Sequence, residues 1–154
     1  MKAESISRLE KYLKDKIPLV KALKAEIKEI DSESVKIWAP LAPNHNHMGS
    51  AFGGSISALL ILGGYTWLYH FMMSQGYEVH VILKSCEIDY KFPINEDLIV
   101  SAHAPKAQQI DKFLSSFKRR KLGRIQIESE IRLGGKLAAI LRGEYVVKMD
   151  DAPS

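Results

Sequence analysis

The stretch from Met48 to Tyr77 contains no Asp, Glu, Lys or Arg over thirty residues, and this limits the possible folds more than any other feature of the chain. By length alone, such a segment can cross a bilayer. However, its first eight residues include three glycines and two serines, the sequence after it alternates like that of a soluble sheet, and no basic segment with a cleavage site opens the chain. We therefore expect no membrane partner, and we interpret the stretch as a helix enclosed by its own protein.

Composition favours one compact domain. The 154 residues are 46% hydrophobic and 26% charged, which is typical of a single core, so we expect one domain over residues 1–154. Cys86 is the only cysteine, which excludes an intramolecular disulfide and favours a reducing, cytoplasmic compartment. The net charge of +4 is too small to indicate a nucleic-acid partner and suits a phosphate-bearing small ligand. We interpret the basic run Lys118–Lys121 as a solvated turn.

Patterns before the central stretch predict a helix and a strand pair. Ser7 followed by Glu10 is a capping-box pattern, which predicts an amphipathic helix that ends before Pro18. Apolar residues between about Leu23 and Ala39 are broken by Asp31-Ser32-Glu33-Ser34. This arrangement indicates two strands joined by a turn.

The central stretch itself predicts a helix from about Gly54 to Ser74, with Gly76 as its C-cap. Residues 79–92 then alternate in two phases. The slip between these phases predicts a β-bulge near Lys84 and Ser85.

The rest of the chain predicts a strand at 98–102, a helix at 110–117 and two strands around a Gly134-Gly135 hairpin turn. A single antiparallel sheet of five or six strands that curls around the apolar helix explains why that helix carries no charge. We therefore predict an α+β hotdog fold.

The run Asn44-His45-Asn46-His47-Met48-Gly49-Ser50-Ala51-Phe52-Gly53-Gly54-Ser55 resembles the signature of the hotdog thioesterases, and in particular the branch of YiiD C-terminal type. Three further segments support the resemblance: Ile17-Pro18-Leu19, Ala39-Pro40-Leu41-Ala42-Pro43 and Ile88-Asp89-Tyr90-Lys91-Phe92-Pro93-Ile94. Together they span most of the chain.

The resemblance implies that a small or medium acyl thioester is hydrolysed by attack of water. The expected substrate is an acyl-CoA or an acyl-carrier thioester, so that CoA enters as part of the substrate and no other cofactor is expected. The family further implies a homodimer, or a dimer of dimers, with the active site between subunits.

The chemistry of the residues agrees with this implication. Thioester hydrolysis passes through a tetrahedral oxyanion, which the free amides at a helix N-terminus can stabilise. Glycines there let a ligand approach the amides, Asn44 could orient the water or the carbonyl, and His47 is the nearest general base. The candidate catalytic residues are Asn44, His47, Phe52, Gly53, Gly54, Ser55 and Asp89.

One departure from the family pattern leaves alternatives open. Phe52 replaces a His of the signature, and the helix has Leu60–Gly64 where many relatives carry an acidic residue. Water must then be activated by His47 or by a partner-subunit group such as Asp89, or else the protein is a non-catalytic acyl-CoA or lipid binding module. The missing carboxylate also argues against hydroxyacyl dehydration. The candidates also have structural alternatives: Asn44 as a turn former, His47 as a loop-packing imidazole, Gly53 and Gly54 as sites of close helix-to-sheet packing, Ser55 as a residue that satisfies the first helical turn, and Asp89 as a strand-surface residue.

The CoA part of the substrate needs cations and an apolar slot. Its phosphates would bind exposed basic residues, for which the candidates are Lys84, Lys91, Arg119, Arg120 and Arg124. A pantetheine arm could lie along Phe52, Tyr65 and Trp67. His45 and His47 form a His-x-His pair without a third ligand nearby in the sequence, so we expect no metal.

Overall fold

The computed structural model describes residues 2–151. Its helices and strands follow each other as α1 (Lys2–Lys16), α2 (Leu19–Leu23), β1 (Glu26–Ile30), β2 (Ser34–Ala39), the 3-10 turn η1 (Ala42–Asn44), α3 (Gly53–Ser74), β3 (Val79–Tyr90), β4 (Leu98–His103), α4 (Ala107–Arg120), β5 (Leu122–Leu133) and β6 (Lys136–Met149). The predicted order of elements is confirmed, except that α2 and η1 were not anticipated.

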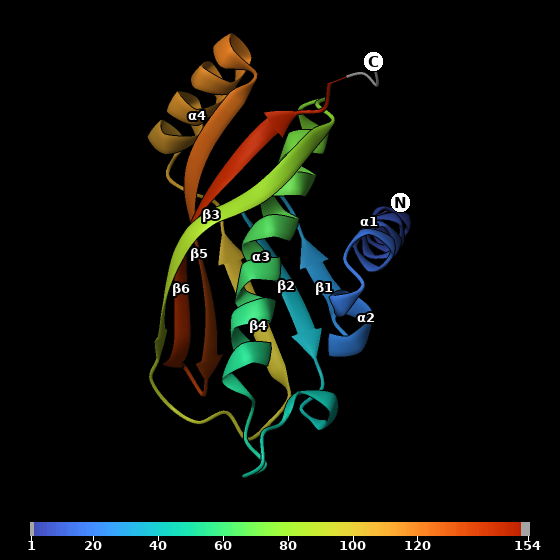
Figure 1. Cartoon of the computed structure of the whole chain (residues 1–154), viewed down its shortest axis with the longest axis vertical. Coiled ribbons are helices and arrows are strands. Elements are labelled where there is room, and N and C mark those ends of the chain that lie inside the picture. The colour runs from blue at the N-terminus through green and yellow to red at the C-terminus, as the bar shows by residue number, and fades with distance from the viewer. Residues whose placement is uncertain (1, 152–154) are drawn as a thin grey trace.

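The six strands form one antiparallel sheet in the order β1-β2-β4-β5-β6-β3. The sheet curves around α3, which lies against its concave face (Figure 1). This is the predicted hotdog architecture. β1 and β3 are the two edge strands, so β3 has a strand neighbour on one side only.

Helix α3 is the centre of the core because its sequence offers no polar face. Leu59, Leu60 and Leu68 are fully buried. Among the described residues, α3 is the one helix long and apolar enough to cross a membrane by length and composition, and 56% of its most apolar window is buried inside the molecule.

Two glycines let α3 approach the sheet closely. A Cβ on Gly63 would lie 2.9 Å from Val100 Cγ1, and one on Gly64 would lie 2.7 Å from Tyr145 Cζ. The Tyr145 hydroxyl donates to the Ile61 carbonyl oxygen at 2.8 Å. The middle of α3, where the family resemblance would place an acidic residue, is therefore packed tightly against the sheet.

One β-bulge and one hairpin turn fall where the sequence predicts them, while the register shifts at Ile27/Glu29 and Ile131/Arg132 were not predicted. The pairing of β3 with β6 shifts between Leu83 and Ser85, so the predicted bulge is confirmed. Gly134 and Gly135 adopt φ angles of 55° and 82°, which are typical of a tight hairpin turn between β5 and β6.

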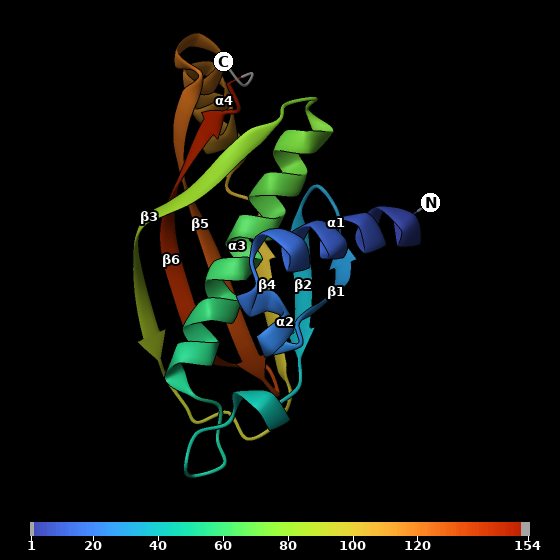
Figure 2. The same cartoon turned by 45° about the vertical axis from the view of Figure 1, so that its right-hand side comes forward.

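The N-terminal helices cover the β1 side of the concave face next to α3 (Figure 2). The ring of Tyr12 in α1 stacks on that of Tyr69 in α3 at 4.5 Å between centroids. The predicted start of this helix was wrong, because α1 already runs from Lys2 and Ser7 lies inside it. The local pattern at Ser7 was overridden by a longer amphipathic helix whose buried residues are Leu9 and Leu13.

The basic run was also misinterpreted. Lys118, Arg119 and Arg120 form the last turn of α4, and only Lys121 leaves the helix, with a left-handed φ of 58°. Cations in a final helical turn are favoured by the helix dipole. The run is thus the end of a helix that is anchored by the buried Phe113 and Phe117.

Candidate active site

Asn44 joins the loop before α3 to the rest of the molecule. It is 2% exposed, and its Nδ2 donates to the carbonyl oxygens of Leu23 at 2.9 Å and Pro40 at 2.8 Å. The main-chain carbonyl oxygen of Asn44 accepts a hydrogen bond from the Phe52 main-chain amide at 2.7 Å. Both protons of the amide group are used within the protein, so this side chain has no donor left for a thioester carbonyl. Asn44 therefore braces the start of α3.

The loop between Asn44 and Phe52 folds on the side chain of Asn46. The Asn46 Oδ1 accepts from the amides of Met48 at 2.8 Å and Ser50 at 3.2 Å, and His45 pairs with Ala51 as an isolated bridge. His47 and Met48 occupy the exposed tip. The loop is compact, and it carries the His47 imidazole outward.

The start of α3 is an uncapped helix N-terminus. Phe52 makes no side-chain cap, and the first helical hydrogen bond runs from the Ile56 amide to the Phe52 carbonyl at 3.0 Å. The amides of Gly53, Gly54 and Ser55 precede that bond and have no acceptor within the helix. Gly54 is exposed and its two neighbours are partly exposed. These donors, with the dipole of a 22-residue helix behind them, can hold an oxyanion.

Two hydroxyl groups donate hydrogen bonds to the carbonyl oxygens of the peptides that carry the Gly54 and Ser55 amides. The Tyr90 hydroxyl donates to the Gly53 carbonyl oxygen at 3.1 Å, and the Ser57 hydroxyl donates to that of Gly54 at 2.9 Å. A hydrogen bond accepted by a peptide carbonyl polarises the N–H of the same peptide. Tyr90 therefore strengthens the Gly54 amide as a donor, and Ser57 strengthens that of Ser55.

The ring of Phe52 lies over Gly54. A Cβ on Gly54 would lie 2.9 Å from Phe52 Cδ2 and closer still to the neighbouring ring carbon. The ring remains 56% exposed. Tyr90, which is 52% exposed, ends β3 and reaches this helix start, and Phe92, 50% exposed, follows two residues later. The candidate oxyanion donors are thus bordered by open aromatic surface.

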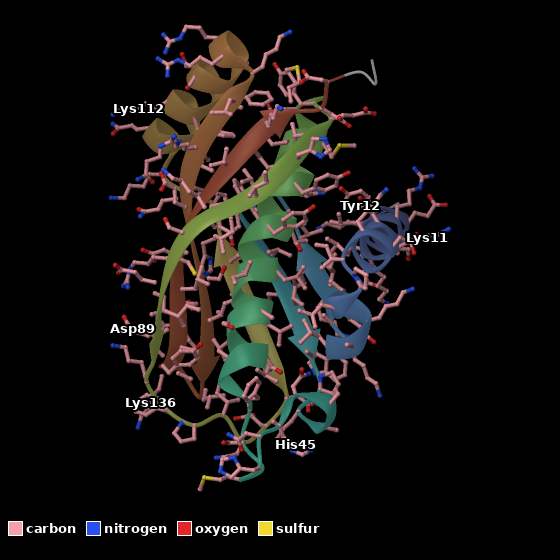
Figure 3. All side chains as sticks on the ribbon, in the orientation of Figure 1. Lys11, Tyr12, His45, Asp89, Lys112 and Lys136 are labelled. Atoms are coloured by element: carbon pink, nitrogen blue, oxygen red, sulfur yellow. The ribbon has the colours of Figure 1, made fainter. Side chains whose placement is uncertain are left out.

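Asp89 lies on the other face of β3. Neighbouring residues on a strand point to opposite sides, and Tyr90 points to Gly53. The Asp89 carboxylate is 3.6 Å from Arg142 Nη1 and projects from the outer side of the sheet (Figure 3). Within one chain, Asp89 is therefore not brought to the start of α3.

The predicted CoA-binding cations are divided between two regions. Lys91 follows Tyr90 and lies near the start of α3, where its amide donates to the Ala138 carbonyl at 2.7 Å. Lys84 lies at the bulge, 4.0 Å from the carboxylate of Glu144. Arg119, Arg120 and Arg124 belong to α4 and the first part of β5. Figure 3 shows how far α4, marked by Lys112, lies from the loop marked by His45.

The aromatic residues predicted to line the pantetheine slot also lie in different parts of the structure. Trp67 is fully buried, and its Nε1 donates to the Ser32 carbonyl at 3.3 Å, so it is a core residue. Tyr65 stacks on Tyr69 at 6.2 Å. Only Phe52 stays beside the candidate oxyanion donors.

The Tyr69 ring lines a cleft of about 320 Å³ between α1 and α3, away from the helix start. Burial raises the pKa of Tyr69 to about 12. Burial also lowers the pKa of His70, which lines the same cleft. Among residues 2–151, no three His, Cys, Asp or Glu side chains gather as metal ligands.

Known structures share this fold. The chain superposes on a protein of unknown function from Chlorobaculum tepidum TLS with a TM-score of 0.90, 21% identity and 97% coverage of both chains. It superposes on the "putative thioesterase from Shewanella oneidensis" with a TM-score of 0.85 and 23% identity, over 95% of this chain and 99% of that one. A Pseudomonas aeruginosa protein described as "Probable Thioesterase" gives a TM-score of 0.77 and 21% identity, over 94% and 96% of the two chains. No curated protein matches the sequence.

The fold defines a hotdog protein. The family model described as "Putative thioesterase (yiiD_Cterm)" matches residues 6–149, and the chain belongs to that family. The resemblance found in the sequence is thereby confirmed.

Proposed function

We propose that this protein hydrolyses a small or medium acyl-CoA. Water adds to the thioester carbonyl carbon, and the carbonyl oxygen becomes an oxyanion held by the Gly54 and Ser55 amides. Collapse of this tetrahedral intermediate breaks the C–S bond, the carboxylic acid leaves, and the thiolate takes up the proton released by water. Loss of one oxyanion donor typically costs about 2.7–4 kcal/mol of barrier, so these amides would dominate the catalysis.

The observation that carries the proposal is the uncapped start of α3 with hydroxyl groups behind its peptides. Here, Phe52 occupies the cap position and leaves the donors open. The hydroxyl groups of Tyr90 and Ser57 donate hydrogen bonds to the carbonyl oxygens of the same peptides.

We further propose that two chains pair through β3. This strand is an edge of the sheet, and the open edge of so long a strand is a liability that a second copy would remove. Antiparallel two-fold pairing would set the Val79 end of one β3 beside the Tyr90 end of the other. Because α4 lies at the same end of the molecule as Val79 (Figure 1), Arg119 and Arg120 of the partner subunit would approach the helix start. A dimer of dimers is compatible with this pairing.

A second candidate function is non-catalytic binding of acyl-CoA or another lipid thioester. Its support is that one chain brings no clear general base to Gly54. Asn44 donates both side-chain amide protons to main-chain carbonyls, so it has no donor left to orient water or substrate. Asp89 faces the outer side of the sheet, and α3 contains no carboxylate. His47, at the exposed loop tip, is the group on which catalysis would then depend.

Thiol release separates the two functions. Purified protein is incubated with acyl-CoAs of increasing chain length, and with the same acyl groups on a carrier protein, while free thiol is followed. We expect turnover of one length class, and a loss of at least tenfold in His47→Ala but not in His103→Ala, which removes an exposed histidine of β4. Saturable acyl-CoA binding without thiol release would establish the binding module instead.

A further inference from the structure

Strand β5 extends beyond its neighbour β4. The two strands pair from Val100 opposite Ile131 to His103 opposite Glu128. β5, however, starts at Leu122 and pairs with β6 along its whole length. The segment from Leu122 to Ile127 is therefore bound to β6 on one side and has no strand on the other, because the chain leaves β4 to build α4. Unpaired main-chain groups along such an edge can receive another strand.

Helix α4 runs beside this edge and leaves a groove of about 680 Å³. The groove is lined by Gln109, Lys112, Phe113, Ser116, Arg120, Leu122, Gly123, Arg124, Ile125 and Gln126. α4 packs directly on β5 at Gly123, where a Cβ would lie 2.7 Å from the Phe113 ring and 3.3 Å from the Phe113 carbonyl oxygen. Five successive residues of β5 form one wall, so the groove follows the main chain of the strand.

All charged residues that line the groove are cations. Lys112 and Arg120 contribute cations from α4, and Arg124 contributes one from β5. Ion pairs within the described part of the chain involve none of these three residues. No Asp or Glu is among the residues that line the groove. Three unneutralised cations along one wall attract an anionic ligand.

We propose that this groove binds an acidic protein segment in extended conformation, which joins the sheet beside Leu122–Ile127. A phosphate ligand would neutralise the cations but leave the strand edge unpaired. An extended acidic peptide satisfies both features, because its main chain pairs with β5 while alternate side chains reach the cations. At about 3.3 Å per residue, the free edge accommodates a strand of five or six residues.

The proposal does not rest on the thioesterase chemistry, although Arg120 of the groove is also a proposed CoA contact across the dimer. The groove lies on the side of β5 away from β6 and β3, so pairing of two copies through β3 leaves it open. Within one chain, it is also remote from the loop that leads into α3 (Figure 3). Failure of peptide binding would therefore say nothing against hydrolysis, and the reverse is also true.

The charge requirement is tested with a dye-labelled, end-capped octapeptide of alternating Glu and Thr, whose binding to the full chain is followed by fluorescence anisotropy at low salt. We expect saturable binding that weakens as salt is added. The triple variant Lys112→Glu, Arg120→Glu, Arg124→Glu should lose at least tenfold in affinity. The control triple variant Lys11→Glu, Lys16→Glu, Lys21→Glu makes the same change of charge at exposed sites on α1 and α2 and should stay within twofold.

The strand requirement is tested with the same peptide N-methylated at alternate residues, which keeps its charge but cannot pair along one edge. We expect binding at least tenfold weaker, and slower amide hydrogen exchange in residues 122–127 with the unmodified peptide only. Equal binding of both peptides would overturn the proposal. So would binding of adenosine 3′,5′-bisphosphate in the groove without binding of the peptide, because the groove would then be a phosphate site.

Discussion

The Tyr90 hydroxyl donates to the Gly53 carbonyl oxygen at 3.1 Å, and that carbonyl belongs to the peptide whose N–H is the exposed donor of Gly54. The two residues are 37 positions apart in the sequence, and β3 brings them together at the start of α3. In the proposed reaction, Tyr90 would act on the substrate oxygen through this peptide rather than by contact. It is a positioning residue of the proposed site.

Tyr90→Phe removes this hydrogen bond and keeps the ring. We expect kcat for acyl-CoA hydrolysis to fall about fivefold, the equivalent of ~1 kcal/mol, with KM unchanged, since the donor weakens mainly toward the oxyanion. Steady-state kinetics measures the two constants separately. Tyr77→Phe, whose ring packs against Phe117, serves as the control and should leave both constants unchanged. A rise in KM with constant kcat in Tyr90→Phe would instead indicate a role in substrate binding.

Asn44→Ala should destabilise the protein. The change leaves the carbonyls of Leu23 and Pro40 without their buried donor, which costs about 1–3 kcal/mol. Asn44→Asp should be at least as harmful, because a carboxylate would face two carbonyl oxygens. Urea unfolding measures both effects. Wild-type stability with lost activity in Asn44→Ala would contradict the bracing role and favour direct contact with the substrate.

Gly64→Ala tests the close approach of α3 to the sheet. The new methyl group would overlap the Tyr145 hydroxyl, and the Tyr145 side chain is fully buried within the core. Overpacking of this kind costs about 1–3 kcal/mol, which thermal unfolding detects as a lower Tm. Adding Tyr145→Phe should recover part of the loss. Equal Tm values for Gly64→Ala and wild type would show that the helix can shift away from the sheet.

The stability of the protein should decrease on acidification partly through His70. Burial lowers its pKa below the ordinary value, and Asp31 opposes this shift. The unfolded chain therefore binds more protons than the folded one just below the ordinary pKa of about 6.5. The stability contribution is present above that pH and is lost as pH falls through the folded pKa. Urea midpoints between pH 7.5 and 5.5 should change less in His70→Gln than in wild type or in His47→Gln, and equal slopes would contradict this.

Much of the fold could be predicted because its signals are local. The uncharged run of α3 predicts that the helix is enclosed, whichever elements enclose it. The phase slip at Lys84 and Ser85 predicts the bulge from the alternation of apolar residues alone. The start of α1 and the end of α4 were harder to place. In both, a short pattern around Ser7 or Lys118 competed with a longer helix that is held by buried residues.

The site could be predicted less completely because its contacts are not local. The signature places Gly53 and Gly54 at the helix start, and the structure keeps them there. Nothing in the sequence shows that Asn44 gives its amide protons to main-chain carbonyls, or that Tyr90 reaches Gly53. Those facts depend on how the loop and β3 meet. The contribution of a second chain depends in turn on an interface that one chain does not contain.

The most direct test of the oxyanion site replaces the Gly54 amide by an ester, with glycolic acid at position 54. This change removes one N–H and no side chain. We predict that kcat falls at least 100-fold, as for the loss of an oxyanion donor, while KM stays within threefold and the circular dichroism spectrum is unchanged. The same replacement at Gly135, in the hairpin turn, is the control and should remain fully active. An unchanged kcat with the ester at position 54 would contradict the account.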